Sequence, residues 1–343
     1  MKTKLKLLAA LLSALLFLGE GLVLRSYAQD FHLSQYTAAS QYLNPALTGV
    51  YFDRQPSYRI YSDYRSQWRS LGGKPFSTYY LAYDMPYKQF GLGGYLISNR
   101  NGMGGLNTIN VMPSASYRVT KSETGPHYLS VGLQMGILYK SFNPNRFTYE
   151  KQYSPDASTV FDPSVSSGEN FNKINSLKPD ANMGVFYKYK DVERKVHPWL
   201  GFAVYHVTKP NESLTGFAKS KLPMRWVYQV GADYEANEKI IVTPMILYMG
   251  QAKAHELNLG VIMSYQLKED GMYCLIGGLN YRNKDAFIIQ AGMKYDRHLF
   301  TFSYDINTSY LSAYTNGRGA FELSILLTGI KGKPLFNPKF GKN

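Results

Sequence analysis

The sequence predicts an all-β protein, a single transmembrane antiparallel up-and-down β-barrel of about 14 strands. Near the carboxyl end, apolar and polar side chains alternate almost without error over 300–307 and again over 321–328. A period of two places alternate side chains on opposite faces of a strand. The pattern recurs along most of the chain in segments of about ten residues, the length that crosses a bilayer as a tilted strand. One face is apolar, the other polar, which is typical of an outer-membrane β-barrel.

The first 28 residues predict export. Three lysines precede an apolar stretch from Leu7 to Leu18, and Ser26-Tyr27-Ala28 forms a small-x-small cleavage site, so residues 1–28 read as a signal peptide. After Ala28 no run approaches the apolar length of a membrane helix, and the mean hydropathy is −0.28. A membrane protein of this kind can span only as a closed barrel, because that arrangement satisfies every backbone group without a helix.

Composition agrees with this fold class. Thirty Tyr and 18 Phe can supply the aromatic girdles of a barrel. The single cysteine, Cys274, cannot form an intrachain disulfide. The net charge of +14 suits the phosphates of lipopolysaccharide and other outer-membrane lipid, or an acidic partner, and in this compartment nucleic acid is excluded as a partner.

The strands follow in order from the alternation. The fifth is among the clearest, with Leu129, Val131 and Leu133 on one face, whereas the second and ninth are less regular. The predicted strands are 57–67, 76–84, 89–100, 107–119, 127–140, 181–190, 198–208, 225–235, 240–249, 255–267, 272–282, 285–295, 299–307 and 319–329.

The connections predict the topology. Every second gap is short, whereas the others include the long stretches 141–180, 209–224 and 308–318. Short periplasmic turns and longer extracellular loops are the usual asymmetry of such barrels. The barrel would occupy 57–330, with a periplasmic segment at 29–56 and a periplasmic tail at 331–343, so that both termini are periplasmic.

No motif for catalysis or for a cofactor is recognisable. The sequence has no phosphate-binding glycine loop, no histidine pair at metal-ligand spacing and no G-x-S-x-G elbow. We therefore expect no enzyme, no metal and no cofactor. An outer-membrane hydrolase with Ser and His on the wall is a distant third possibility, because no His stands beside a Ser at a recognisable spacing.

Several charges share the inward face of their strands. They form either an interior network that holds a hydrated barrel in shape or a path for a solute or peptide. These candidate lumen charges are Arg59, Asp63, Arg65, Asp233, Lys294, Asp305 and Glu322.

Two outward regions are candidate contacts for a partner. The pair Trp68-Arg69 in the first outer loop is either a partner anchor or part of the aromatic girdle. The loop Ser141 to Asp180 is unusually long, and such loops are commonly functional or disordered. Its aromatic side chains either meet a partner or fold the loop back over the barrel mouth; they are Tyr149, Tyr153, Phe161 and Phe171.

The segment before the barrel, His32 to Tyr51, is rich in aromatic residues that suit neither a spanning strand nor a long helix. Such a stretch is unfavourable when exposed to water, so it should pack on something. We expect it to plug the barrel from within or beneath, with Asn44-Pro45 setting a turn and with Tyr42 and Leu43 as anchors. A docking site for a periplasmic partner is the alternative.

The chain also resembles the PorP/SprF family of the type IX secretion system. The resemblance rests on Ser34-Gln35-Tyr36 and Tyr42-Leu43-Asn44-Pro45-Ala46, then on Tyr64-Arg65-Ser66-Gln67-Trp68, Gly91-Leu92-Gly93-Gly94 and a final strand with Phe321-Glu322-Leu323-Ser324. Leu47 stands where the family often has Phe or a similar apolar residue.

The resemblance implies an outer-membrane barrel of the Bacteroidota secretion and gliding apparatus, which assists secretion or surface anchoring of a secreted protein or adhesin with a C-terminal sorting domain. Periplasmic type IX machinery is a further possible partner. The alternative function is a passive porin or a hydrophobic-solute transporter.

Overall fold

The computed structural model describes residues 30–52, 56–71, 74–102, 105–120, 125–153, 161–169, 174–214, 220–267, 272–331 and 335. The predicted signal peptide and most of the predicted tail lie outside these residues. Among the described residues, no helix has the length and apolar character that crossing a membrane requires.

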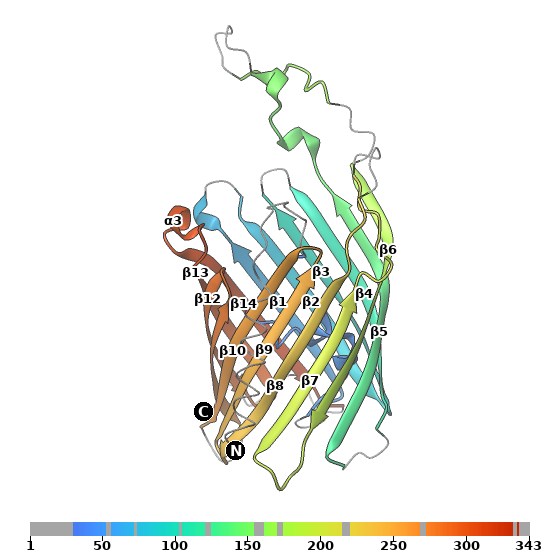
Figure 1. The fold of residues 1–343 in the computed structure, drawn as a ribbon, viewed down its shortest axis with the longest axis vertical. Helices are drawn as coiled ribbons and strands as arrows, with labels where there is room; N and C mark the ends of the chain where they lie inside the picture. Colours follow the sequence, from blue (N-terminus) through green and yellow to red (C-terminus); the bar gives the residue numbers. More distant parts are fainter. Residues whose placement is uncertain are drawn as a thin grey trace, which may run out of the picture.

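The structure is a closed antiparallel barrel of fourteen strands, which confirms the predicted fold class (Figure 1). Each strand pairs with its sequence neighbours, and β1 closes the barrel on β14 with Arg65 opposite Glu322. The strands are β1 (Tyr58–Gln67), β2 (Phe76–Tyr87), β3 (Phe90–Asn101), β4 (Leu106–Arg118), β5 (His127–Ser141), β6 (Asn175–Tyr189), β7 (Val196–Tyr205), β8 (Arg225–Asn237), β9 (Ile240–Gln251), β10 (Ala254–Gln266), β11 (Tyr273–Arg282), β12 (Ala286–Tyr295), β13 (His298–Asn307) and β14 (Arg318–Gly329).

Short helices complete the described fold. They are α2 (Ser40–Leu43) and η1 (Pro45–Leu47) before the barrel, then η2 (Arg69–Leu71), η3 (Pro144–Arg146), η4 (Glu150–Gln152) and α3 (Ser312–Thr315) in the connections.

Three strand boundaries differ from the prediction by three residues or more: the start of β6, the end of β2, and the end of β7, which lies at Tyr205 rather than at 208. β6 begins at Asn175 rather than 181, so the connection after β5 is shorter than the predicted Ser141 to Asp180; β2 likewise continues through Pro86 to Tyr87. The added stretches contain Pro179 and Pro86, although proline lacks the N–H that a ladder needs. In β6 the exception is possible because β7 pairs with it only from Met183 onward, which leaves Pro179 on a segment with β5 as its partner.

The alternation places apolar side chains outside and polar ones inside. On β13, Phe300 and Phe302 are exposed whereas Thr301, Ser303 and Asp305 are buried. This arrangement is the reverse of a soluble barrel and suits a wall in contact with lipid.

The connections divide by length between the two ends of the barrel. One end, here called the short-turn end, carries turns such as 88–89, 238–239 and 296–297. The opposite, long-loop end carries 142–174, 206–224 and 308–317. The green connection between β5 and β6, with η3 and η4, stands beyond the barrel at this end (Figure 1).

Candidate functional site

The chain before the first strand runs through the barrel lumen from the long-loop end to the short-turn end. Asp30 contacts the long-loop ends of β7, β8 and β9. At the other end of this segment, the Phe52 carbonyl accepts a hydrogen bond of 2.6 Å from Lys190 in the short turn after β6. We call residues 30–52 the lumen segment; it is the dark blue stretch inside the barrel in Figure 1.

The two ends of the described chain therefore lie at opposite ends of the barrel. Lys331 follows β14 at the short-turn end, whereas Asp30 lies at the long-loop end. Residues 1–29 and most of the predicted tail lie outside the described residues, so the placement of both termini in the periplasm stays a prediction. The sidedness of the barrel in the membrane stays a prediction as well.

Ion pairs hold the part of the lumen segment that lies at the long-loop end of the barrel. His206 lies between two carboxylates, with Nε2 2.7 Å from Asp30 and Nδ1 2.5 Å from Asp180, and Arg225 lies 3.4 Å from Asp30. Burial alone would raise the pKa of Asp30, but His206 and Arg225 lower it well below its usual range. Burial likewise would lower the pKa of His206, whereas Asp30 and Asp180 raise it to about 9. The imidazolium thus donates to both carboxylates near neutral pH.

Closer to the short-turn end, a buried charge cluster on the wall binds the backbone of the lumen segment. Arg65 lies 2.8 Å from Asp305 and 3.1 Å from Glu322, and all three are almost fully buried. Glu322 accepts hydrogen bonds from the backbone N–H groups of Ser34, at 2.8 Å, and Gln35, at 2.7 Å. The cluster is therefore completed by the segment, because each carboxylate has donors from both the wall and the segment.

Tyr42 contacts both the rest of the segment and the wall, through hydrogen bonds and through its ring. Its hydroxyl donates to the Phe31 carbonyl and accepts from Arg225 at 2.7 Å, while its carbonyl accepts from the Tyr205 hydroxyl at 2.7 Å. The ring stacks on Phe31 with centroids 5.9 Å apart and meets Tyr80 edge-on. Such contacts restrain both the position and the rotation of the side chain.

Leu43 and the Asn44-Pro45 turn lie in the middle of the lumen. Leu43 packs in a buried cluster with side chains of β7, β8 and β9. The Asn44 side chain caps η1 by accepting from Ala46 N at 2.9 Å, and it donates to the Val185 carbonyl at 3.0 Å. A mid-lumen turn at Asn44-Pro45 agrees with the expected geometry.

Two wall glycines make room for this turn. A Cβ atom at Gly132 would lie 2.3 Å from the Pro45 carbonyl carbon, and one at Gly184 would lie 2.1 Å from Asn44 Oδ1. Real Cβ atoms do not approach other atoms so closely. The backbone of the segment can therefore contact the wall here only because Gly132 and Gly184 have no side chains.

Asp84 holds the part of the lumen segment near the short-turn end of the barrel. It accepts from Gly49 N at 2.7 Å and from the Tyr51 hydroxyl at 2.9 Å, and it pairs with Arg59 at 2.6 Å. The predicted lumen charge Arg59 thus pairs with a carboxylate that the prediction did not single out, and it also contacts the segment directly, with its guanidinium 4.2 Å from the Tyr51 ring centroid.

The remaining candidate lumen charges also face inward. Asp63 is buried and accepts from the Tyr61 hydroxyl at 3.0 Å. Asp233 pairs with Lys188 at 2.6 Å, and Lys294 is half-buried on β12. Arg65, Asp305 and Glu322 are thus brought together, whereas Asp233 and Lys294 lie apart from them. Whether any of them lines a solute path stays a prediction.

The candidate outer contacts lie at the long-loop end. The Trp68 ring meets Phe76 edge-on with centroids 5.0 Å apart, and the Arg69 guanidinium lies 5.1 Å above Phe321. This pair is therefore tied to the barrel rim.

Within the long connection after β5, the described aromatic side chains contact other residues of the connection. The Tyr149 hydroxyl donates to the Pro144 carbonyl at 2.8 Å, and the Tyr153 and Phe161 rings lie 5.1 Å apart. Tyr153 remains half exposed. Phe171 lies outside the described residues.

The prediction missed several residues that hold the segment, chiefly His206, Asp84 and Arg225. Arg225 alternates with outward-facing Trp226, so its inward position was readable from the sequence pattern. Its partners were not, because they come from the lumen segment, far away in sequence. In the described part of the chain, no group of three or more His, Cys, Asp or Glu side chains could hold a metal ion.

These features define a membrane β-barrel whose lumen contains the segment that precedes its first strand. The chain belongs to the family of type IX secretion system membrane proteins PorP/SprF, whose model matches residues 25–327.

The chain is also similar to solved barrel structures. For the Ralstonia pickettii toluene transporter TbuX, the TM-score is 0.49 at 11% identity, covering 84% of this chain and 92% of that one. For the CymD monoaromatic hydrocarbon channel, it is 0.48 at 12% identity, covering 84% and 91%. For the Pseudomonas putida toluene transporter TodX, it is 0.45 at 12% identity, covering 87% and 93%. No curated protein matches the chain in sequence.

Proposed function

We propose that this protein is a non-enzymatic outer-membrane component of the type IX secretion and gliding apparatus of a member of the Bacteroidota. It would assist secretion or surface anchoring of a secreted protein or adhesin that bears a C-terminal sorting domain. Membership of the PorP/SprF family supports the assignment to this apparatus. In the proposed orientation, the signal peptide directs export and the long loops face outward.

The occupied lumen is the observation that carries this proposal. The segment contacts the wall at both ends and in the middle, through Asp30, Tyr42 and Gly49. A passive pore needs a continuous hydrated path, whereas here the lumen segment runs along the interior and contacts the wall from one end to the other. A closed barrel is better suited to act through its surfaces, as a binding or anchoring component.

The outward surface for this role would be the connection after β5 together with the rim around Trp68. Phe147 and Tyr153 of this connection are exposed, which suits a protein interface. Because Tyr153 packs on Phe161 and Tyr149 is held by the Pro144 carbonyl, the connection can present a preformed surface to a partner.

The alternative function is a passive porin or a transporter of hydrophobic solutes. One feature favours it: the wall behind the segment is polar and charged, so departure of the segment would leave a surface that water can wet. The two functions differ in whether the lumen opens without a partner.

Conductance and partner capture together test the proposal. The purified protein in planar bilayers should show no steady large conductance, and affinity capture from cross-linked cells should recover a secreted protein with a C-terminal sorting domain. Capture from cells that lack the secretion apparatus is the matched control. Steady large conductance without a captured secreted protein would instead support the porin.

A further inference from the structure

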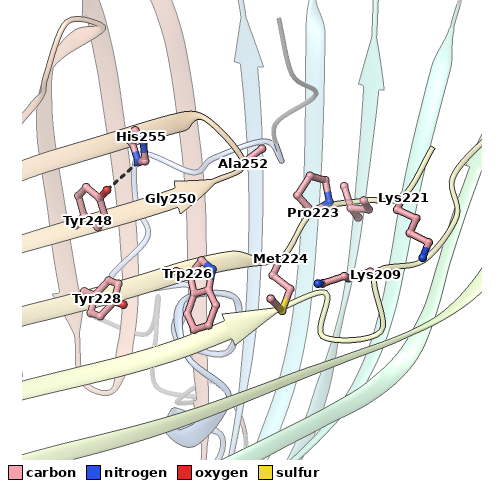
Figure 2. Close-up of a pocket in the computed structure, with 11 residues that line it drawn as sticks. Lys209, Lys221, Pro223, Met224, Trp226, Tyr228, Tyr248, Gly250, Ala252 and His255 are labelled. Atoms are coloured by element: carbon pink, nitrogen blue, oxygen red, sulfur yellow. Dashed lines mark hydrogen bonds between the residues drawn. The ribbon is translucent and has the colours of Figure 1, made fainter. Parts of the chain in front are cut away.

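A groove of about 630 Å³ lies on the outer face of the wall, at the long-loop ends of β8, β9 and β10 (Figure 2). Its floor is formed by side chains that point away from the lumen. Trp226 and Tyr228 are 39% and 46% exposed, whereas Val227 between them is 1% exposed. The groove therefore faces the lipid and is separate from the lumen segment.

The strand register creates the hollow. Trp226 on β8 stands opposite Gly250 on β9, and Gly250 stands opposite His255 on β10. An indole and an imidazole thus flank a position without a side chain. A Cβ atom at Gly250 would lie 3.3 Å from His255 Nδ1 and 3.7 Å from both Cε1 and the hydroxyl of Tyr248, so these two side chains border the position and a larger side chain would displace them.

A second aromatic row continues the floor towards the membrane centre. Tyr228 stands opposite Tyr248, with ring centroids 6.1 Å apart. The Tyr248 hydroxyl and His255 Nδ1 lie 2.8 Å apart, which fixes both rings across the strands. This floor is broad, apolar and already ordered, and it can accommodate an extended hydrocarbon chain.

Two lysines stand at the opposite, loop end of the groove. Lys209 and Lys221 belong to the connection between β7 and β8 (Figure 2). Among the described residues, neither ammonium group forms an ion pair with a carboxylate. Both are therefore available to an anion at the level where the wall meets the lipid headgroups.

We propose that this groove binds a phosphate-bearing membrane lipid, with its phosphate on Lys209 and Lys221 and an acyl chain over the Gly250 hollow. The order of charged and aromatic groups along the groove supports this occupant, because the cations lie at its loop end and the aromatic surface lies deeper in the wall. A lipid has the same order, with an anionic headgroup above an apolar chain. In the orientation proposed above, the lipid comes from the outer leaflet.

Native mass spectrometry of the detergent-purified protein tests the proposal. The probes are bis-phosphorylated lipid A, its dephosphorylated form and inorganic phosphate. One molecule of bis-phosphorylated lipid A should bind to the parent protein at least tenfold more tightly than the dephosphorylated form. Lys209→Gln/Lys221→Gln should remove this difference, and Gly250→Leu should weaken binding of both lipid forms by filling the hollow.

Each variant has a matched control. Gly277→Leu makes the same change on β11, where a Cβ atom meets nothing within 4 Å. Lys74→Gln/Lys151→Gln removes the same charge elsewhere at the long-loop end. Both controls should bind lipid A as the parent does, and the heat-dependent gel mobility of every variant should show a folded barrel.

Three results would overturn the proposal. Unchanged lipid affinity in folded Gly250→Leu would mean that no acyl chain occupies the hollow. Equal loss of affinity in the two lysine pairs would mean that only net charge matters. Displacement of the lipid by inorganic phosphate at equal concentration would make the site an anion site of the loop rather than a lipid site.

Discussion

Replacing Tyr42, Leu43 and Asn44 together with alanine should detach the lumen segment and open the barrel. These residues form the middle of the segment, where it contacts β6, β7 and β8. The substitutions leave the strands unchanged. Any change in conductance therefore reports on the segment rather than on the wall.

The expected loss of docking energy follows from the contacts. Removing a buried aromatic side chain such as Tyr42 costs about 3–5 kcal/mol, and removing a buried leucine about 2–5 kcal/mol. Losing the Asn44 hydrogen bonds adds about 1–3 kcal/mol. Because the three residues are neighbours, their effects are not additive. Taking the Tyr42 term alone as the lower bound, the equilibrium constant for docking of the segment should still fall roughly 100-fold to 4,000-fold, since about 1.4 kcal/mol corresponds to a factor of ten.

Planar-bilayer conductance and heat-dependent gel mobility provide the assay. The parent should be closed, and the triple variant should show steady openings while the barrel remains folded. A second perturbation acts from the wall: Gly184→Ala places a Cβ atom 2.1 Å from Asn44 Oδ1, whereas the control Gly277→Ala meets nothing within 4 Å. Gly184→Ala should open the barrel in part, and Gly277→Ala should not.

One result would refute this reasoning about the plug. If the purified triple variant were as closed and as heat-stable as the parent, yet failed to support secretion in cells, the three residues would serve as a docking site for a periplasmic partner. Tyr42, Leu43 and Asn44 would then be buried in one state of the protein and accessible to the partner in another.

Three further predictions concern other parts of the site. Since the pKa of His206 is raised to about 9 from 6.5, its stabilisation of the docked segment should be complete below about pH 6.5 and be lost as the pH rises through about 9; conductance of the parent should increase over this range, and His206→Gln should lack the dependence. Arg65→Leu leaves two buried carboxylates without this cation and should lower the free energy of unfolding in urea by about 3–5 kcal/mol, with a smaller loss for Arg65→Lys. Replacing residues 143–173 with a short turn should retain the barrel but abolish retention of the secreted partner at the surface, as measured by surface labelling; unchanged retention would place the contact elsewhere.

The wall was predictable because its physical determinants are local. Alternation with a period of two identifies each strand and both of its faces, and the lengths of the connections assign the two ends. The errors occurred where a local rule met a tertiary exception. Pro179 cannot donate to a ladder, yet it lies within β6, where β5 is the paired strand.

The path of the lumen segment was only partly predictable. Its aromatic content and the turn signal at Asn44-Pro45 indicated that it packs against the barrel. Its direction depends on contacts such as Asp30 with His206, which are far apart in sequence and have no periodic signature. The role of Gly132 and Gly184 in making room for the segment is likewise visible only in the structure, because a glycine in a strand can be present for several different reasons.

The way the segment is held suggests how a closed lumen can be compatible with a role in secretion. Glu322 and Asp84 bind the segment through hydrogen bonds to backbone N–H groups at Ser34, Gln35 and Gly49. Water can replace such bonds, so their net contribution is far smaller than their strength in isolation. An apolar wall would oppose hydration after the segment leaves, whereas this polar wall does not. The interior charges that the sequence assigned to a hydrated lumen thus suit two states, one in which they bind the segment and one in which they bind water.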